Sequence, residues 1–225
     1  MEELEKQLFY IFSFIPVSHG VILPWLITLV ISIVVFCCSR NLSTFCKTKS
    51  QAALELLYET LEYLTTEITG KEYAARLMPL LSTIFVYIFC ANIMGLIPGL
   101  KSPTSLFSNC LGMALIVFIF TCYLGIKEHG FKYIKHFTGD TWWMAPLMLP
   151  IHIIGEISHP ISLTLRLFGN IMGEDTVILV LTVSMFPLLL PIPMMAMSIF
   201  SGLLQALVFT ILSGVYFSSA LAEAH

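Results

Sequence analysis

The hydrophobic positions of this chain gather into long runs, and polar positions mark where the runs end. Apolar residues dominate 21–38, 77–97 and 106–126. Each run has close to the roughly 20 residues that a helix needs to cross the hydrocarbon of a bilayer. A further stretch, 144–190, continues for 47 residues without a convincing loop, and 193–221 is a last long apolar run. The pattern predicts about five membrane helices.

Residues 51–69 follow a different pattern, which predicts an amphipathic helix that does not cross the membrane. Apolar residues recur there every three or four positions, and four glutamates lie off that stripe (Leu54, Leu57, Leu61, Leu64 and Ile68; Glu55, Glu59, Glu62 and Glu67). Anionic lipid would repel such an acidic face. We therefore expect this helix to pack on its own protein at the cytoplasmic surface, and the alternative is a docking face for a partner helix.

The stretch 144–190 is too long for a single upright crossing. As one helix it would measure about 70 Å, against a hydrocarbon layer of about 30 Å. It either crosses twice with a tight turn or lies strongly tilted, and prolines end it at Pro187 and Pro191. If the chain folds back beside Pro187 as an antiparallel hairpin, Arg166 and Gln205 should lie at the same depth.

Composition supports an all-α, polytopic membrane protein with a single membrane domain over 1–225. Hydrophobic residues make up 57% of the chain and charged residues 11%, whereas soluble domains average about 25% charged. Open sheets cannot satisfy their backbone in lipid. The net charge of −3 and the lack of a basic patch give no indication of nucleic-acid binding. The six cysteines form no CxxC pair and are expected to be small core residues.

The basic residues orient the chain. Lys6 and Lys101 fall in segments that the predicted topology places outside. Eight of the eleven basic residues fall in segments that it places in the cytoplasm: Arg40, Lys47, Lys49, Lys71, Arg76, Lys127, Lys132 and Lys135. Cytoplasmic loops of membrane proteins carry such an excess. The N-terminus is therefore expected outside and the C-terminus in the cytoplasm.

Arg166 is the basic residue that lies deep inside a hydrophobic run. A charge at bilayer depth costs at least about 2.5–3.5 kcal/mol, and a guanidinium does not lose its proton in proteins. Intramembrane charges are functional by default, so we interpret Arg166 as a functional cation. The structural alternative is a buried ion pair with Glu156 or Glu174 that fastens helices together.

Polar residues flank Arg166 along the same predicted helix. Ser162 and Asn170 lie four residues before and after it, on one face. Asp175 is nine residues on, which places it on the opposite side about 13 Å along the axis. Glu156 and His159 form a polar pair earlier in the helix, beside a proline that should kink it. The cation is thus flanked on both sides by titratable groups.

Two further groups of polar residues give weaker signals. His152, Glu156 and His159 have a spacing that a metal could use, but one carboxylate between two histidines is common on helices, so no metal or other cofactor is expected. Asn92 and Gln205 are polar residues inside apolar runs. They are either ordinary hydrogen-bonding contacts between helices or part of a functional site.

Several of these residues lie in segments that resemble a known family. Leu163-Thr-Leu-Arg-Leu-Phe-Gly-Asn170 resembles the signature of subunit a of the membrane sector of F-type ATP synthases. Asn92 with Gly95-Leu-Ile-Pro-Gly99 resembles a second block, and Gln205-Ala-Leu-Val-Phe with Tyr216 resembles the last helix. The resemblance covers about 70–225.

The resemblance implies a proton-channel stator, without an ATP site of its own, in a bacterial inner membrane. Its expected partners are a ring of c subunits, the peripheral-stalk b subunits, the rest of the synthase and the lipid bilayer. Two half-channels would meet the ring on either side of Arg166, which would force ring carboxylates to ionise and would block leakage. The path residues implied are Glu156, His159, Glu174, Asp175, Ser162, Asn170, Gln205 and Asn92.

This sequence also departs from the family pattern. The family often has Gly where this chain has Glu174, so either Glu174 or Asp175 could line a half-channel, and Asp175 is preferred. Seven residues before Gln205, some members carry a His or an acid, and this chain has Ser198. The family's long horizontal hairpin favours tilt for 144–190. A secondary transporter that binds an anion and a structural scaffold are the alternative functions.

Overall fold

The computed structural model describes residues 19–39, 49–96, 102–130, 145–183 and 191–222. These residues form long helices and one short 3₁₀ turn, with no strand among them, which confirms the all-α prediction. In chain order the elements are α2 (His19–Ser39), α3 (Lys49–Met94), η1 (Pro103–Ser105), α4 (Phe107–His129), α6 (Ala145–Val183) and α7 (Pro191–Ala222).

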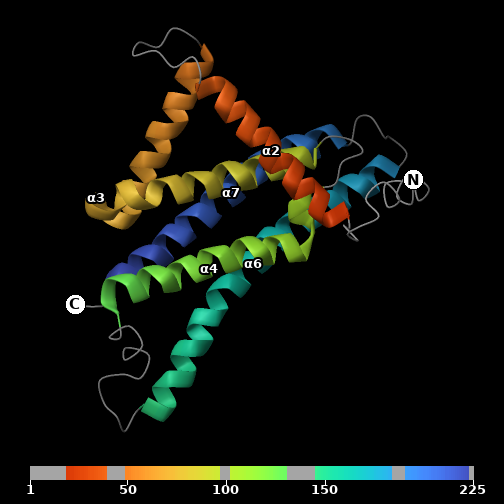
Figure 1. Cartoon of the computed structure of the whole chain (residues 1–225). Helices are drawn as coiled ribbons and strands as arrows, with labels where there is room; N and C mark the ends of the chain where they lie inside the picture. The colour runs from red at the N-terminus through yellow and green to blue at the C-terminus, as the bar shows by residue number, and fades with distance from the viewer. Residues whose placement is uncertain (1–18, 40–48, 97–101, 131–144, 184–190, 223–225) are drawn as a thin grey trace, which may run out of the picture.

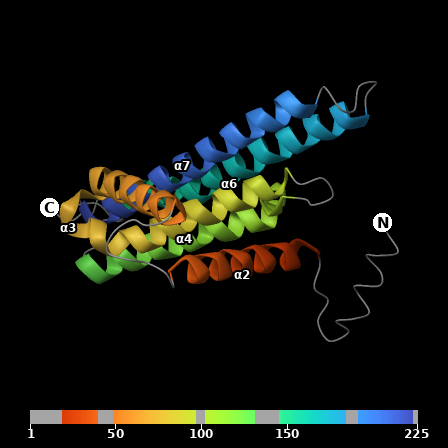
Figure 2. The ribbon, with the colours of Figure 1, turned by 90° about the horizontal axis from the view of Figure 1, so that it is seen from above.

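The core lies where α3, α4, α6 and α7 pack together (Figure 1). Each helix contributes fully buried apolar side chains to one cluster, among them Leu77, Leu81, Ile88, Val117, Leu163, Leu167, Phe209 and Phe217. In contrast, α2 stands beside this bundle (Figure 2), and Ile27 is the buried hydrophobic residue among its described side chains. The exposed apolar side chains of α2, such as Trp25 and Phe36, suit a lipid environment.

Helix α3 contains the amphipathic segment expected at 51–69 and residues 77–94 of the span expected at 77–97, joined through a sharp bend at Gly70 (Figure 1). Gly70 has φ 76° and ψ 159°, a backbone conformation that is essentially restricted to glycine. Because the chain turns within one residue, no loop separates the two parts. The helix axis changes direction there instead.

The second half of the amphipathic segment packs on α7. Leu61, Thr65 and Thr69 are buried, and a Cβ added at Gly214 of α7 would lie 3.1 Å from Cγ2 of Ile68. Leu57, in the first half, is exposed. The segment therefore contacts its own protein through its C-terminal turns.

Three helices are long and apolar enough to cross a membrane, judged by length and composition within the described residues: Leu54–Met94, Phe107–Glu128 and Ile192–Ala222. Helix α6 has 39 residues and continues through Pro150 and Pro160. At 1.5 Å per residue it is about 59 Å long. The described part of the long stretch is thus one helix, 145–183, without the tight turn of the double-crossing alternative, and its tilt in the membrane stays a prediction.

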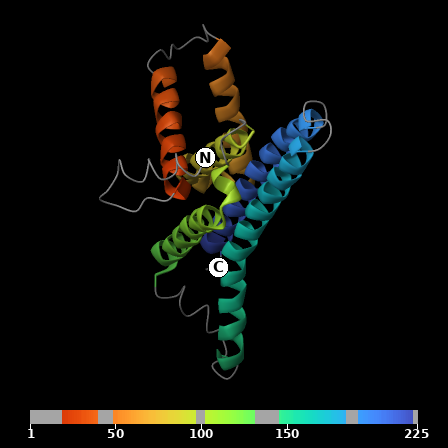
Figure 3. The same cartoon turned by 90° about the vertical axis from the view of Figure 1, so that its right-hand side faces the viewer.

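Helices α6 and α7 run antiparallel, side by side, over most of α7, as the blue-green ribbon of α6 and the blue ribbon of α7 show in Figures 2 and 3. The first turns of α6 extend beyond the other helices (Figure 3). The expected hairpin is therefore present, and it places the polar residues of both helices along one seam.

Gly70→Ala should destabilise the protein, because the left-handed backbone at this bend costs about 1–3 kcal/mol for a residue with a side chain. Gly112→Ala is the matched control. Gly112 lies within helix α4 with nothing within 4 Å of an added Cβ, so this change should be neutral or stabilise by up to about 1 kcal/mol. Thermal unfolding of the purified complex measures both, and equal effects would contradict the role given to Gly70.

Candidate functional site

Three contacts between polar side chains join α6 to α7. Asn170 Nδ2 donates to Gln205 Oε1 over 2.9 Å, and the Ser198 hydroxyl donates to Glu174 Oε2 over 2.6 Å. Toward the other end of the seam, the His159 ring stacks on Tyr216, with ring centroids 4.2 Å apart and an angle of 10° between the planes. Together these contacts form a polar seam, which is the name used below for this set of six residues.

The seam fixes the register of the two helices. Asn170 lies opposite Gln205, and the His159–Tyr216 contact fits the same register because the residue numbers of both pairs add to 375. The Ser198–Glu174 bond departs from that register by three residues, because those residue numbers add to 372. The two registers place Arg166 opposite residue 209 or residue 206 of α7, and a common depth for Arg166 and Gln205 stays a prediction.

Arg166 lies between the two ends of the seam, seven residues after His159 and eight before Glu174. Its side chain is exposed. Within the described ranges it forms no hydrogen bond or ion pair, so the expected alternative of an ion pair with Glu156 or Glu174 is not formed. Titratable groups thus lie about 10 and 12 Å from Arg166 along the helix axis, one on each side.

A stripe of small, exposed residues runs along α6 through the position of Arg166. Counting Arg166 in the middle, its members recur at intervals of three or four residues, and all are exposed. They are Gly155, Ser158, Ser162, Gly169, Gly173 and Thr176. An added Cβ at any of the three glycines would meet nothing within 4 Å. The packing of this chain therefore does not require glycine there, and the face leaves room for another helix to approach closely.

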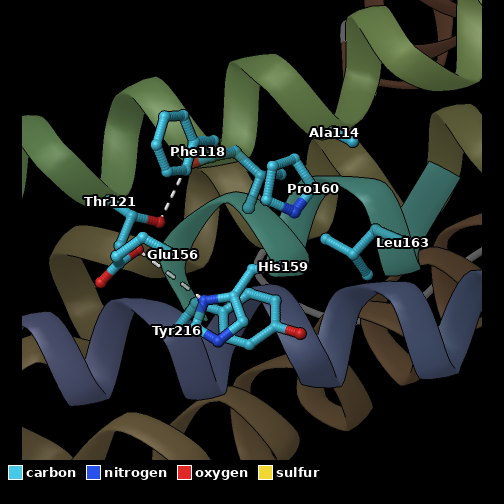
Figure 4. A pocket seen from close by; sticks show the side chains of 9 residues that line it. Ala114, Phe118, Thr121, Glu156, His159, Pro160, Leu163 and Tyr216 are labelled. Carbon is cyan, nitrogen blue, oxygen red and sulfur yellow. Dashed lines mark hydrogen bonds and ion pairs between the residues drawn. The ribbon is translucent and has the colours of Figure 1, made fainter. Parts of the chain in front are cut away.

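Glu156 and His159 line a small pocket between α4, α6 and α7 (Figure 4). The His159 Nδ1 and a Glu156 carboxylate oxygen lie 3.8 Å apart, and the Tyr216 ring covers the imidazole from α7. The cavity volume of about 10 Å³ is near the lower limit for one water molecule. The remaining lining residues are Ala114, Val117, Phe118, Thr121, Pro160 and Leu163.

At the other end of the seam, the two neighbouring acids differ in what they contact. Glu174 is half-buried and accepts a hydrogen bond from the Ser198 hydroxyl on α7. Asp175 is also half-buried, and lies one residue further around the helix. Glu174 is therefore the acid with a hydrogen bond across the α6–α7 seam, although the sequence favoured Asp175 for the path.

Asn92 lies apart from the seam. It is buried near the end of α3, and both ends of its amide are hydrogen-bonded: Nδ2 donates to the Gly202 carbonyl over 3.1 Å, and Oδ1 accepts from the Thr104 hydroxyl over 2.8 Å. In the part of the chain that the structure describes, no group of three His, Cys, Asp or Glu side chains could hold a metal ion.

Sequence reasoning did not find the contacts made by Tyr216 and Ser198. Both residues lie on α7, so their partners depend on the register between two helices that are far apart in sequence. With the Asn170–Gln205 pair known, the antiparallel register points to Tyr216 as the partner of His159. The spacing of polar residues along the two helices contains the His159–Tyr216 pairing, but one tertiary contact must be known before the pairing can be identified.

The comparisons with known proteins show the family of this chain. The family model described as ATP synthase A chain matches residues 21–218. The chain belongs to the ATP synthase A chain family. It is 40% identical to ATP synthase subunit a of Desulfosudis oleivorans, over 92% of this chain and 90% of that protein.

Two further relatives are similar over most of their length. The chain is 43% identical to ATP synthase subunit a 1 of Syntrophotalea carbinolica, over 89% of this chain and 85% of that protein. It is 39% identical to ATP synthase subunit a of Geobacter sulfurreducens, over 92% and 90%. Together with its long apolar helices, family membership makes this chain a membrane protein of ATP synthesis and proton transport.

The Asn170–Gln205 hydrogen bond should contribute measurably to the stability of the hairpin. In a double-mutant cycle with Asn170→Ala and Gln205→Ala, we expect a coupling of about 0.6 kcal/mol, the average for such bonds in membrane proteins. Thermal unfolding of the purified complex measures the coupling. Additive effects of the two substitutions would contradict a direct contact between these side chains.

Proposed function

We propose that this chain is the proton-channel stator of a bacterial F-type ATP synthase, with Arg166 as the fixed cation of the motor. The observation that carries the proposal is the state of Arg166: a permanent charge in the middle of a long apolar helix, exposed and without an ion-pair partner among the described residues. Leaving such a charge unpaired is costly in a membrane. A partner that brings a carboxylate to it would compensate that cost.

The face around Arg166 supports a ring of small helical subunits as that partner. The exposed glycines and serines of α6 allow a helix to pack closely against it. A carboxylate carried at mid-membrane on that helix would then pass close to the guanidinium. The c-subunit ring of the synthase is the partner proposed for this face, and the remaining partners are the b subunits, the rest of the complex and the surrounding lipid.

The groups on either side of Arg166 support two separate half-channels. Glu156 and His159, at the end of the seam near Tyr216, would line the cytoplasmic half-channel. Glu174, held by Ser198, would line the outer one together with Asp175. Ser162, Asn170 and Gln205 lie between these groups and would shape the site around the cation. This assignment places the N-terminus outside and the C-terminus in the cytoplasm of the inner membrane.

Coulomb attraction explains why a ring carboxyl releases its proton when it reaches Arg166. A carboxylate about 4 Å from a guanidinium gains about 4 kcal/mol at an effective dielectric constant of 20, which corresponds to about three units of carboxyl pKa. A protonated ring carboxyl that arrives at Arg166 must therefore release its proton into one half-channel. After it moves on, it takes a proton from the other, and the cation repels any proton that would pass directly.

Arg166→Ala should abolish ATP-driven proton pumping while the complex still assembles. Loss of about 4 kcal/mol of ion-pairing lowers the ionised fraction of the ring carboxyl by up to about 1,000-fold. Arg166→Lys should not restore pumping, because a desolvated ammonium can lose its proton and lacks the planar guanidinium. Acidification of inverted membrane vesicles measures pumping.

Lys127→Ala is the matched control, since it removes a cation at the end of α4, away from the seam. It should pump like the wild type. Normal pumping by Arg166→Lys would overturn the electrostatic role proposed for Arg166.

Glu174→Gln should slow proton flux by about 100-fold, the lower end of what a positioned acid or base contributes. Ser198→Ala should cause a smaller loss, because the carboxylate remains but loses its hydroxyl donor. Glu59→Gln, which neutralises an exposed acid of the surface helix, serves as the control in the same vesicle assay. A larger loss for Asp175→Asn than for Glu174→Gln would assign the outer path to Asp175 instead.

A further inference from the structure

A chain of buried hydrogen bonds ties the end of α3 and the η1 turn to α7. Asn92 Nδ2 donates to the Gly202 carbonyl over 3.1 Å. The Thr104 hydroxyl donates to Asn92 Oδ1 over 2.8 Å, and the Ser102 hydroxyl donates to the Ala91 carbonyl over 3.0 Å. The side chains that donate are at most 8% exposed, so water does not compete for these bonds. We call Asn92, Ser102, Thr104 and Gly202 the α7 clamp.

The clamp fixes the orientation of the Asn92 amide. The Gly202 carbonyl can only accept, so the amide nitrogen of Asn92 must face α7, and the amide oxygen on the other side accepts from the Thr104 hydroxyl. The Ser102 oxygen lies beside the Thr104 oxygen, but each hydroxyl has one hydrogen, and these go to the Ala91 carbonyl and to Asn92. The carbonyl of Gly202 can accept this bond in addition to its helical one, because a carbonyl oxygen has two lone pairs.

Glycine is required for this close approach. A Cβ at Gly202 would lie 3.1 Å from Cβ of Asn92, and a Cβ at Gly95 would lie 2.8 Å from Cβ of Ser102. Both distances are shorter than ordinary van der Waals contact. The two glycines therefore let η1 and α3 pack against each other and against α7, which is the opposite of the open glycines on the exposed face of α6.

The position of Gly202 connects the clamp to the seam. Gly202 is four residues after Ser198 and three before Gln205, so the anchored carbonyl lies one helical turn from each of the α7 side chains that bond to α6. A second contact reaches α6 from the same region, where Phe107 at the start of α4 packs edge-on against Phe168, with ring centroids 5.6 Å apart.

We propose that Asn92 is a positioning residue, which holds α7 at the height and rotation that place Ser198 against Glu174 and Gln205 against Asn170. The inference rests on the proposed function, because it assigns Asn92 to the geometry of the proton path and not to the transfer of protons. Since both ends of its amide are engaged, Asn92 acts through α7.

Thr104→Val tests the clamp without touching α7, because valine keeps the shape of threonine but cannot donate to Asn92. Pumping per assembled complex should fall by about threefold to tenfold, the change in an equilibrium constant that one buried hydrogen bond of average strength represents. Thr104→Ser keeps the hydroxyl and should pump like the wild type. Thr65→Val is the matched control, since Thr65 is equally buried but bonds within its own helix.

Hydrogen exchange of the assembled complex gives a readout that does not depend on pumping. Amides of 198–206 should exchange about threefold to tenfold faster in Thr104→Val and at the wild-type rate in Thr104→Ser. Wild-type exchange in Thr104→Val would overturn the clamp. Faster exchange with unchanged pumping per complex would overturn the positioning role. Normal pumping by Arg166→Ala would instead overturn the proposed function, and the exchange result would still decide the clamp.

Discussion

The arrangement of this protein depends on one uncompensated charge. Arg166 is permanently ionised, lies within a long apolar helix, and has no ion-pair partner among the residues described. Burial of such a charge inside the chain would require an acid beside it, yet the acids of α6 lie elsewhere: Glu174 bonds Ser198 and Glu156 lies beside His159. The fold therefore presents the charge outward, on a face of small residues, instead of neutralising it internally.

The helix pair α6–α7 places polar contacts on both sides of Arg166 along the helix axis. Because the helices are antiparallel and in contact, His159, Asn170 and Glu174 of α6 each meet a particular residue of α7. The contacts at Tyr216 and Ser198 fall on opposite sides of Arg166. A shift of four residues between the helices would move every one of these pairs by one turn. The register of the pair is thus as important as the identity of its residues.

The rest of the bundle serves to hold that register. The buried cluster shared by α3, α4, α6 and α7 keeps the helices together but is apolar, and apolar contacts tolerate sliding more readily than hydrogen bonds do. The directional contacts come from the amides of Asn92 and Gln205. The polar side chains of Asn92 and Gln205 thus lie at the positions where one helix must be oriented against another.

Residue pattern alone determined the helical class, the long runs and the importance of Arg166, because the cost of placing charge and open backbone in lipid depends only on local sequence. Pattern also located Glu156, His159, Asn170 and Gln205. Tertiary structure decided what each of them touches: Gln205 meets Asn170 and not Arg166, Glu174 and not Asp175 bonds across the seam, and Asn92 bonds to α7. Those outcomes depend on the rotation and height of one helix against another, which side-chain packing fixes and periodicity along a single helix does not contain.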